Sequence, residues 1–269
     1  MLERQNGQDR TPPNGGPNWN LRQPLVHPGP RGVAPQPNTQ ARQPQRFALF
    51  AGVTGSDLAI IFAAARERCF ERQEVLFLEG SPMRRVILLS SGMVKITQVG
   101  ISGMEVILRL NGPGDMICAP SSLTRITHSE SAKAIDTCRA VLWDVPVFDG
   151  FLDRFPMLQR NFCKLLEDRL QNLTERFREV ATERVHRRVA NELVRLVRRL
   201  GRPVDGAVEI ALSREELAQM TGTTLFTVSR LLSEWQGIGA VLPRRQSVLV
   251  RNVEVLLAHV NAEPTGTET

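Results

Sequence analysis

The segment Ser213–Arg230, SREELAQMTGTTLFTVSR, decides the fold of the C-terminal part of the chain. Ser213 and Glu216 have the spacing of a capping box, in which each side chain bonds the backbone N–H of the other residue, so a helix should begin here. Gly222 follows this helix and can adopt the positive φ of a tight turn. Beyond it, apolar residues recur at the spacing of a helix buried along one face: Val228, Leu231, Leu232 and Trp235. The segment predicts two helices joined by a turn, a helix-turn-helix.

The start of the second helix is the part that we expect to face DNA. A recognition helix contacts base edges in the major groove through its N-terminal residues. We therefore predict base contacts from Thr224, Phe226, Thr227, Ser229 and Arg230.

Runs of β-prone residues flank the two helices. The run 208–212 precedes the first helix, and the runs 240–242 and 247–251 are joined by a turn that begins with Pro243. Strand, helix, helix and hairpin make a winged helix-turn-helix. Its turns and hairpin tip are expected to contact the DNA backbone through Ser213, Thr223, Arg244 and Arg245.

The positive charge of the chain is concentrated on this C-terminal part. The 269 residues carry a formal net charge of +6, and residues 182–251 hold twelve arginines, no lysine and seven acidic residues. Residues 47–181 balance sixteen basic against sixteen acidic residues. A basic surface on the predicted helices suits binding to phosphates, so double-stranded DNA is the expected partner.

Both ends of the chain have the composition of tails. Residues 1–46 contain nine prolines and five glycines without hydrophobic periodicity, so we predict disorder there, as also for 258–269. An inert extension is expected, the alternative being non-specific DNA contact by its arginines. The N-terminal segment lacks the apolar core of a secretory signal, and no run reaches about 18 apolar residues. We expect a soluble, cytoplasmic protein without a membrane partner.

The four cysteines, Cys69, Cys118, Cys138 and Cys163, include no C-x-x-C pair. This pattern favours buried thiols in a reducing compartment over disulfides or a metal site. An iron–sulfur cluster is not expected, because it needs four thiolates brought together. Redox sensing by Cys69 or Cys163 is the alternative.

Short β-prone runs separated by glycine-containing turns fill the region 47–150. The runs are 74–78, 85–89, 93–97 and 105–110, and 142–146 is expected to close the domain. This spacing predicts an antiparallel sandwich or roll.

Three motifs in this region, VLFLEG (75–80), SSGMVK (90–95) and GPGD (112–115), resemble the cyclic-nucleotide-binding β-roll. With a long helix and a winged helix-turn-helix after it, the chain resembles the Crp/Fnr superfamily of bacterial transcription regulators over residues 48–257. The resemblance implies an α+β chain with an antiparallel β-roll at 47–150, a dimerisation helix at 151–181 and a winged helix-turn-helix domain at 182–257. It also implies a homodimer that binds a palindromic operator, with RNA polymerase as a further partner and an effector on the β-roll.

The segment 156–181 fits the dimerisation helix. Its apolar residues follow a heptad-like pattern: Phe162, Leu166, Leu170, Leu173, Phe177 and Val180. Packing of this face on the chain's own β-roll is the alternative. A second helix should start near Thr182 and end at Gly201 and Pro203. Its arginines are expected to face solvent: Arg184, Arg187, Arg188, Arg195, Arg198 and Arg199.

The effector motifs depart from those of members that bind cyclic AMP. Those members hold the ribose with a Gly-Glu pair and the cyclic phosphate with Arg-Ser-Ala, whereas this chain has 118–120 (CAP) and 130–132 (ESA). An acidic side chain in place of the arginine repels the cyclic phosphate instead of attracting it. At a separation of about 4 Å this costs roughly 1 kcal/mol of binding free energy in water and several in a shielded pocket. We predict that cyclic AMP is not the effector, although Arg125 could replace the missing arginine. The candidate pocket residues are Cys118, Arg125, Glu130 and Ser131.

The effector itself stays open between another small molecule (a different nucleotide or a 2-oxo acid), haem, and none. Haem-binding members carry a Cys near the position of Cys118. At the position of their His ligand, however, this chain has Pro120, and only His128 is close in sequence. Haem is therefore not expected. A haem-based gas sensor of this fold and an interaction protein that does not bind DNA are the alternative functions. An enzyme is not expected, because 112–115 lacks the strand-to-helix setting and the lysine of a phosphate-binding loop.

Base recognition departs from the family as well. The common pattern places Glu four residues before the Arg of the recognition helix, and this chain has Phe226 there, with Arg230 retained. Arg230 can bond guanine O6 and N7, worth about 1–3 kcal/mol of discrimination, and Phe226 can pack on a thymine methyl group. The half-site should therefore differ from those of familiar members, with half-site centres about 34 Å apart.

Overall fold

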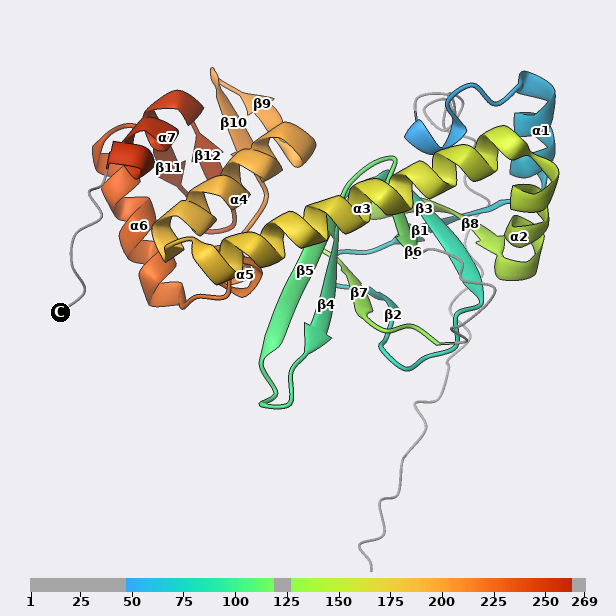
Figure 1. Ribbon diagram of the computed structural model, residues 1–269, viewed down its shortest axis with the longest axis horizontal. Helices are drawn as coiled ribbons and strands as arrows, with labels where there is room; N and C mark the ends of the chain where they lie inside the picture. Colours follow the sequence, from blue (N-terminus) through green and yellow to red (C-terminus); the bar gives the residue numbers. More distant parts are fainter. Residues whose placement is uncertain (1–46, 119–126, 263–269) are drawn as a thin grey trace, which may run out of the picture. The chain divides into compact units, whose positions relative to one another are not determined.

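The computed structural model describes residues 47–118 and 127–262. A short 3-10 helix, η3 (Ala48–Phe50), and helix α1 (Gly55–Ala63) precede the first strands (Figure 1). The strands that follow are β1 (Arg66–Phe70), β2 (Val75–Phe77), β3 (Arg85–Ser91), β4 (Val94–Val99), β5 (Glu105–Asn111), β6 (Met116–Cys118), β7 (Ser131–Ala134) and β8 (Cys138–Asp144). They form two antiparallel four-stranded sheets, in the orders β1-β8-β3-β6 and β2-β7-β4-β5. The predicted α+β fold with an antiparallel β-roll is confirmed.

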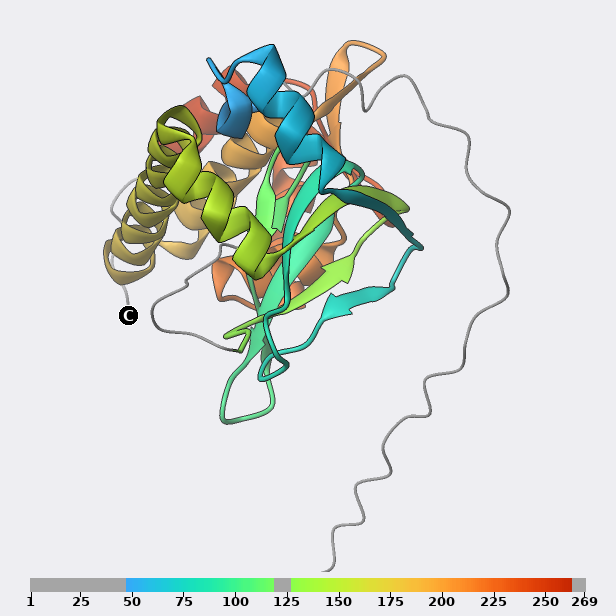
Figure 2. The ribbon, with the colours of Figure 1, turned by 90° about the vertical axis from the view of Figure 1, so that its right-hand side faces the viewer.

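Strand β3 shows why the run 85–89 is apolar without a break. Successive side chains of a strand point to opposite faces. Ile87 and Leu89 pack between the two sheets, and Val86 and Leu88 pack on the other side of their sheet. That outer side is covered by η3, α1, the next helix α2 (Val145–Arg154) and the start of α3 (Pro156–Thr182) (Figure 2). Both faces of β3 are therefore buried.

The C-terminal part begins with α4 (Val185–Leu200). A four-stranded antiparallel sheet in the order β11-β12-β10-β9 packs beside the helices, and Pro203 lies in its edge strand, where a missing N–H costs nothing to the ladder. Its elements are β9 (Arg202–Val204), β10 (Ala207–Ile210), α5 (Arg214–Thr221), α6 (Leu225–Gly237), β11 (Val241–Pro243), β12 (Val248–Val250) and α7 (Val253–Ala262).

Two boundaries differ from the sequence expectation. The sequence predicts a strand at 142–146, but β8 ends at Asp144, and Val145 begins α2 with Pro146 in its first turn. Proline fits there because the first N–H groups of a helix have no intrahelical partner. At the other end, α7 runs to Ala262, past the predicted domain end at 257. The predicted tail 1–46 and residues 263–269 lie outside the described residues.

Within the described ranges, no helix is both long and apolar enough to cross a membrane.

Candidate DNA-binding surface and effector cavity

Helix α5 begins and ends as the sequence predicts. Ser213 Oγ accepts the backbone N–H of Glu216 at 3.2 Å, and Glu216 Oε2 accepts the backbone N–H of Ser213 at 2.9 Å. Gly222 ends the helix in the left-handed region at φ 62°, which glycine adopts without a steric cost. The backbone N–H of Thr223 then donates to Ala218 O at 3.1 Å. This geometry confirms the capping box and the turn into α6.

Helix α6 is buried along the predicted stripe and exposed at its start. Val228, Leu232 and Trp235 are fully buried and Leu231 nearly so. On the other side, Leu225 and Phe226 are 50% and 79% exposed, and Arg230 is exposed one turn further on. The apolar stripe therefore holds α6 so that the side of its first two turns that carries Phe226 and Arg230 faces outward.

The predicted DNA-contacting residues differ in whether their polar groups already bond other residues of the protein. The hydroxyl groups of Ser213 and Thr224 both act as helix caps, and Thr224 Oγ1 accepts the backbone N–H of Thr227 at 3.1 Å. No described residue bonds or pairs with the guanidinium groups of Arg230 and Arg245. The two arginines keep all their donors available, whereas Ser213 and Thr224 position the helices.

The hairpin β11–β12 forms the wing, with Arg244 and Arg245 exposed in its turn. Arg244 Nη1 lies 3.5 Å from Glu209 Oε1 on β10, and Ser247 Oγ donates to the same oxygen at 2.7 Å. The carboxylate of Glu209 therefore ties the base of the wing to its sheet.

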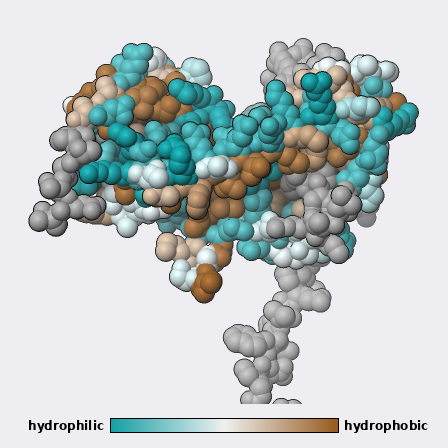
Figure 3. Space-filling view, viewed as in Figure 1, coloured by the Kyte–Doolittle hydropathy of each residue, from teal (hydrophilic) through white to brown (hydrophobic). Residues whose placement is uncertain are grey.

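The long helix α3 carries an exposed apolar stripe, visible as a brown run along it in Figure 3. The stripe consists of Leu166, Leu170, Leu173, Phe177 and Val180, between 38% and 74% exposed. Phe162, which the sequence also assigns to this seam, is instead 7% exposed and packs in the core of the β-roll. Cys163 is exposed and continues the spacing of the stripe, three residues before Leu166. Part of α3 thus packs on its own β-roll, and the rest leaves an apolar face uncovered.

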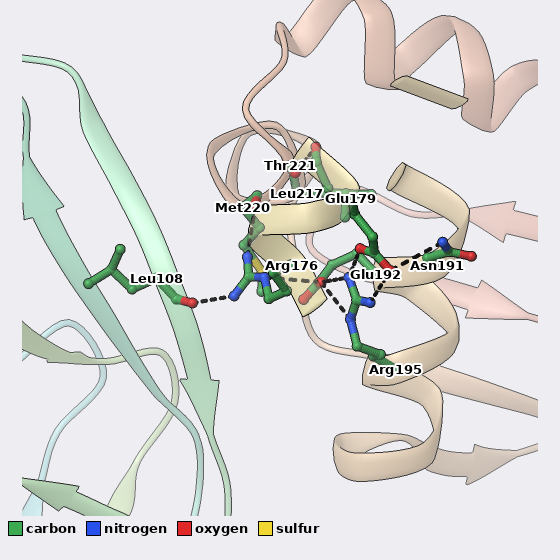
Figure 4. Close-up of polar contacts among 9 residues, drawn as sticks. All are labelled: Leu108, Arg176, Glu179, Asn191, Glu192, Arg195, Leu217, Met220 and Thr221. Carbon is green, nitrogen blue, oxygen red and sulfur yellow. Dashed lines mark hydrogen bonds and ion pairs between the residues drawn. The ribbon is translucent and has the colours of Figure 1, made fainter. Parts of the chain in front are cut away.

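Helices α3 and α4 are joined by a cluster of charges that we call the ion cluster: Arg176, Glu179, Glu192 and Arg195 (Figure 4). Arg195 binds both carboxylate oxygens of Glu179, at 2.7 and 2.8 Å, and Glu192 at 2.7 Å. Burial by itself raises the pKa of Glu179, but the hydrogen bonds and charge of Arg195 outweigh it and hold that pKa below its usual value. The prediction that Arg195 faces solvent is wrong, because two nearly buried carboxylates face it.

A cavity of about 490 Å³ lies between β5, α3 and α4. Arg109 and Glu130 lie in its wall and form a two-bonded ion pair, with Arg109 Nη1 2.8 Å from Glu130 Oε2 and a second contact between Nη2 and Oε1. Asn111 lines the cavity too, 2% exposed, and its Oδ1 has no hydrogen-bond partner. Glu130, which the resemblance places at the position of the family's phosphate-binding arginine, is therefore already paired with Arg109 of β5.

The other predicted pocket residues do not join Glu130. Ser131 Oγ accepts the backbone N–H of Glu79 at 3.0 Å and does not line the cavity. His128 is 6% exposed and stacks on Phe77 with ring centroids 3.7 Å apart; burial holds its pKa below the usual value. Arg125 and the side chain of Cys118 lie outside the described residues. An imidazole fixed flat against Phe77 and away from the cavity does not fit the role of a haem ligand.

The cysteines depart from the expectation of buried thiols. Cys138 is buried, and burial beside Asp136 raises the pKa of its thiol to about 12, but Cys69 and Cys163 are exposed. No group of three or more His, Cys, Asp or Glu within the described ranges is placed to hold a metal ion.

Two family models match the chain in the order in which the two folded parts occur. Residues 67–155 match the cyclic nucleotide-binding domain, and residues 187–259 match the Crp-like helix-turn-helix domain. The chain belongs to the Crp/Fnr superfamily. It has the domain composition of Crp-like transcription regulators, with a helix-turn-helix DNA-binding domain after the β-roll.

Relatives and solved structures agree with this assignment. The chain is 29% identical over 213 residues to the CRP-like cAMP-activated global transcriptional regulator of Mycobacterium tuberculosis, covering 78% of this chain and 95% of that protein. It is 26% identical over 208 residues to the cyclic AMP receptor protein of Thermus thermophilus, covering 77% and 94%. The fold is shared with the c-di-GMP responsive regulator CLP of Xanthomonas campestris, at a TM-score of 0.64 and 18% identity over 73% of this chain and 99% of that one. The first of these relatives is by its name a transcriptional regulator.

Proposed function

We propose that this Crp/Fnr protein is a homodimeric transcription regulator that binds a palindromic operator through α6 and does not use cyclic AMP as its effector. The observation that carries the proposal is the exposed start of α6, where Phe226 projects and Arg230 has no partner among the described residues. A guanidinium with free donors on this helix suits the paired acceptors of guanine. DNA as the ligand implies action in the cytoplasm, with RNA polymerase as the expected further partner.

The apolar stripe on α3 supports a homodimer. Five apolar side chains at heptad spacing are exposed along one helix, and such a stripe is usually covered by an identical helix in a coiled coil. A two-fold dimer would present two copies of α6, which corresponds to two half-sites separated by about one turn of DNA, roughly 34 Å. The base contacts remain assigned to Thr224, Phe226, Thr227, Ser229 and Arg230, and the backbone contacts to Ser213, Thr223, Arg244 and Arg245.

The pair Arg109–Glu130 supports an effector other than cyclic AMP. Two relatives are named for cyclic AMP. At the position where the resemblance to cyclic-AMP-binding members implies a phosphate-binding arginine, this chain has the carboxylate of Glu130, in the wall of the cavity. Arg109 is the nearby cation, and it is bound by both carboxylate oxygens of Glu130. A phosphate would have to displace Glu130 and leave its charge unpaired in a partly buried wall, which costs several kcal/mol by order of magnitude.

Selection from random duplex DNA followed by gel shifts tests the proposal. The parent should select a palindrome, and Arg230→Ala should lose preference at one G·C pair in each half-site, about tenfold or more, because its bidentate contact is gone. Arg244→Ala is the matched control: it removes the same charge from a wing position, so all sequences should weaken alike. Cyclic AMP should leave every affinity unchanged.

Two outcomes would contradict the proposal. If Arg230→Ala binds the selected operator as tightly and as selectively as the parent, the base-contact assignment is wrong. If the parent selects no sequence at all, the alternative of an interaction protein gains support, with exposed Phe226 as its contact.

A further inference from the structure

The side chain of Arg176, in the last part of α3, connects three other elements (Figure 4). One of its terminal nitrogens donates to Leu108 O on β5, and the other donates to Met220 O in the last turn of α5 at 2.9 Å. Its Nε lies 3.7 Å from Glu192 Oε2 on α4. A single planar guanidinium thus bonds the β-roll on one side and the helix-turn-helix on the other.

The carbonyl at Met220 is one that needs such a partner. The last four carbonyls of a helix have no intrahelical donor, and positive charge is favourable there. Arg188 Nη2 lies 3.3 Å from Thr221 O in the same turn, so guanidinium groups from α3 and α4 together satisfy the end of α5. Gly222 and α6 follow directly. The position of Arg176 therefore bears on the helix that carries the proposed base contacts.

The other polar links between the β-roll and the C-terminal part are more exposed. Arg199 pairs with Asp115 and Arg202 with Asp136, but the two arginine side chains are 49% and 59% exposed. Arg72, which donates to Gln246 at 3.0 Å, is exposed as well. Exposed pairs are screened by solvent and contribute little. The side chain of Arg176 is 21% exposed, and its partner Glu192 is 6% exposed. Beside these links, Ile107 and Leu110 of β5 belong to the same apolar core as α5 and α6, which gives close packing but little directional restraint.

We propose that Arg176 is a positioning residue that fixes α5 and α6 relative to β5 and α3 and thereby sets the operator half-site spacing that the dimer accepts. This inference rests on the proposed function, since spacing has meaning only for a dimer on a palindrome. In such a dimer the two α3 helices form the shared seam, so the separation of the two α6 helices depends on how each is held to its own α3. One extra base pair moves a half-site by about 3.4 Å and rotates it by roughly 35°. A dimer with firmly held α6 helices rejects such a site, and a dimer with loosened ones adapts to it.

The experiment measures the full-length protein on its selected operator and on versions with one base pair added to or removed from the centre. The quantity compared is the ratio of affinities between the selected spacing and the altered ones. Arg176→Met removes both carbonyl bonds and keeps an unbranched apolar stem that reaches as far as the arginine Nε. Arg176→Lys keeps the charge beside Glu192, but one ammonium cannot span carbonyls on opposite sides. Arg178→Met is the matched control on the same helix, because the Arg178 side chain is 57% exposed and its guanidinium pairs with Glu183 at 3.6 Å, without reaching β5 or α5.

We expect the spacing ratio to fall about tenfold or more in Arg176→Met, because each of the two lost charge-assisted hydrogen bonds is worth about a factor of ten. It should fall also in Arg176→Lys and stay unchanged in Arg178→Met, while affinity for a single half-site stays the same in all four proteins. A ratio that remains at the parental value in Arg176→Lys overturns the inference, even if Arg176→Met does not fold. A parent without any spacing preference instead contradicts the proposed palindromic operator, and the inference falls with it.

Discussion

Phe226 is the residue at which this chain departs most clearly from the DNA-binding pattern of its superfamily. Its ring is 79% exposed in the first turn of α6, although burying an aromatic ring in the core would be favourable. Nothing in the local helix requires it there, because Thr224 supplies the cap and Val228 begins the buried stripe. The proposed contact with DNA gives the exposed ring a role, because an apolar group at a base edge can pack on the methyl group of thymine.

Replacing this residue tests that assignment. Phe226→Glu should shift the preferred base pair at its position toward cytosine by about tenfold, because a carboxylate accepts a hydrogen bond from cytosine N4. Phe226→Ala should lose the thymine preference without gaining another. Competition binding against operators randomised at each position measures both. Unchanged base preferences in Phe226→Ala would show that the ring touches no base.

At the scale of elements, much of the fold follows from the sequence, because the deciding signals are local. The capping box, the left-handed Gly222 and the stripe of α6 depend on residues a few positions apart. Strands β1, β6 and β7 carry no such signal: β1 has four exposed residues of five, and its pairing with β8 is fixed by partners distant in sequence. Long-range pairing of this kind cannot be predicted from local pattern alone.

Helix α3 shows how close alternatives are decided by tertiary contacts. A heptad-like stripe that continues at Leu166 can begin at Phe162, four residues earlier, or at Cys163, three residues earlier. From the sequence, Phe162 is the expected first member because its side chain is the more apolar. The core of the β-roll takes Phe162, which rotates Cys163 onto the exposed face. The arginines of α4 present the same difficulty, since periodicity places Arg195 on a polar face without revealing that Glu179 of α3 lies against it.

The ion cluster between α3 and α4 predicts a specific dependence of stability on pH. The pKa of Glu179 is lowered in the folded protein, so its contribution is present above its usual value of 4.5 and is lost as pH falls through the lower, folded value. Glu179→Gln should therefore destabilise the protein at pH 7 by about 2 kcal/mol, the scale of a hydrogen bond to a charged group. The difference from the parent should shrink below pH 4.5.

Chemical denaturation at a series of pH values measures this difference. Glu175→Gln is the control, because it makes the same change one turn earlier on α3 at an exposed carboxylate. A destabilisation by Glu179→Gln that is equally large at pH 3.5 and pH 7 would show that packing, and not the charge of Glu179, is what the substitution removes.

At the scale of the whole molecule, the two folded parts are joined by different kinds of contact with different consequences. Apolar residues of β5 enter the core around α5 and α6, and Arg176 adds a directed polar bond. Arg72, in the turn after β1, also donates to Gln246 in the wing at 3.0 Å. A change in the β-roll therefore has a physical path to α6 and to the wing, as an effector-controlled regulator requires. The cavity borders this path, since Arg176 and Met220 are among its lining residues.

The stripe on α3 makes a final prediction about assembly, with Cys163 as a built-in probe. In a parallel two-fold seam, equivalent residues of the two helices face each other, and Cys163 continues the alternating spacing of three and four that runs through Leu166 and Leu170. Equivalent Cα atoms then lie within the roughly 4.4–6.8 Å that a disulfide spans. Mild oxidation should therefore link two chains covalently, with two thiols giving one disulfide as the oxidant takes up two electrons.

Non-reducing electrophoresis of the oxidised protein measures the linkage. Cys163→Ser should abolish it and Cys69→Ser should leave it intact, because Cys69 is exposed on β1 and not on the stripe. Leu170→Asp should prevent it as well and shift the unoxidised protein to the monomer in sedimentation, since a charge in the seam cannot be solvated. A dimer that persists in Leu170→Asp, or a linkage carried by Cys69, would mean that the chains associate through another surface. The distance between the two α6 helices would then not be determined by how each α6 is held to its own α3.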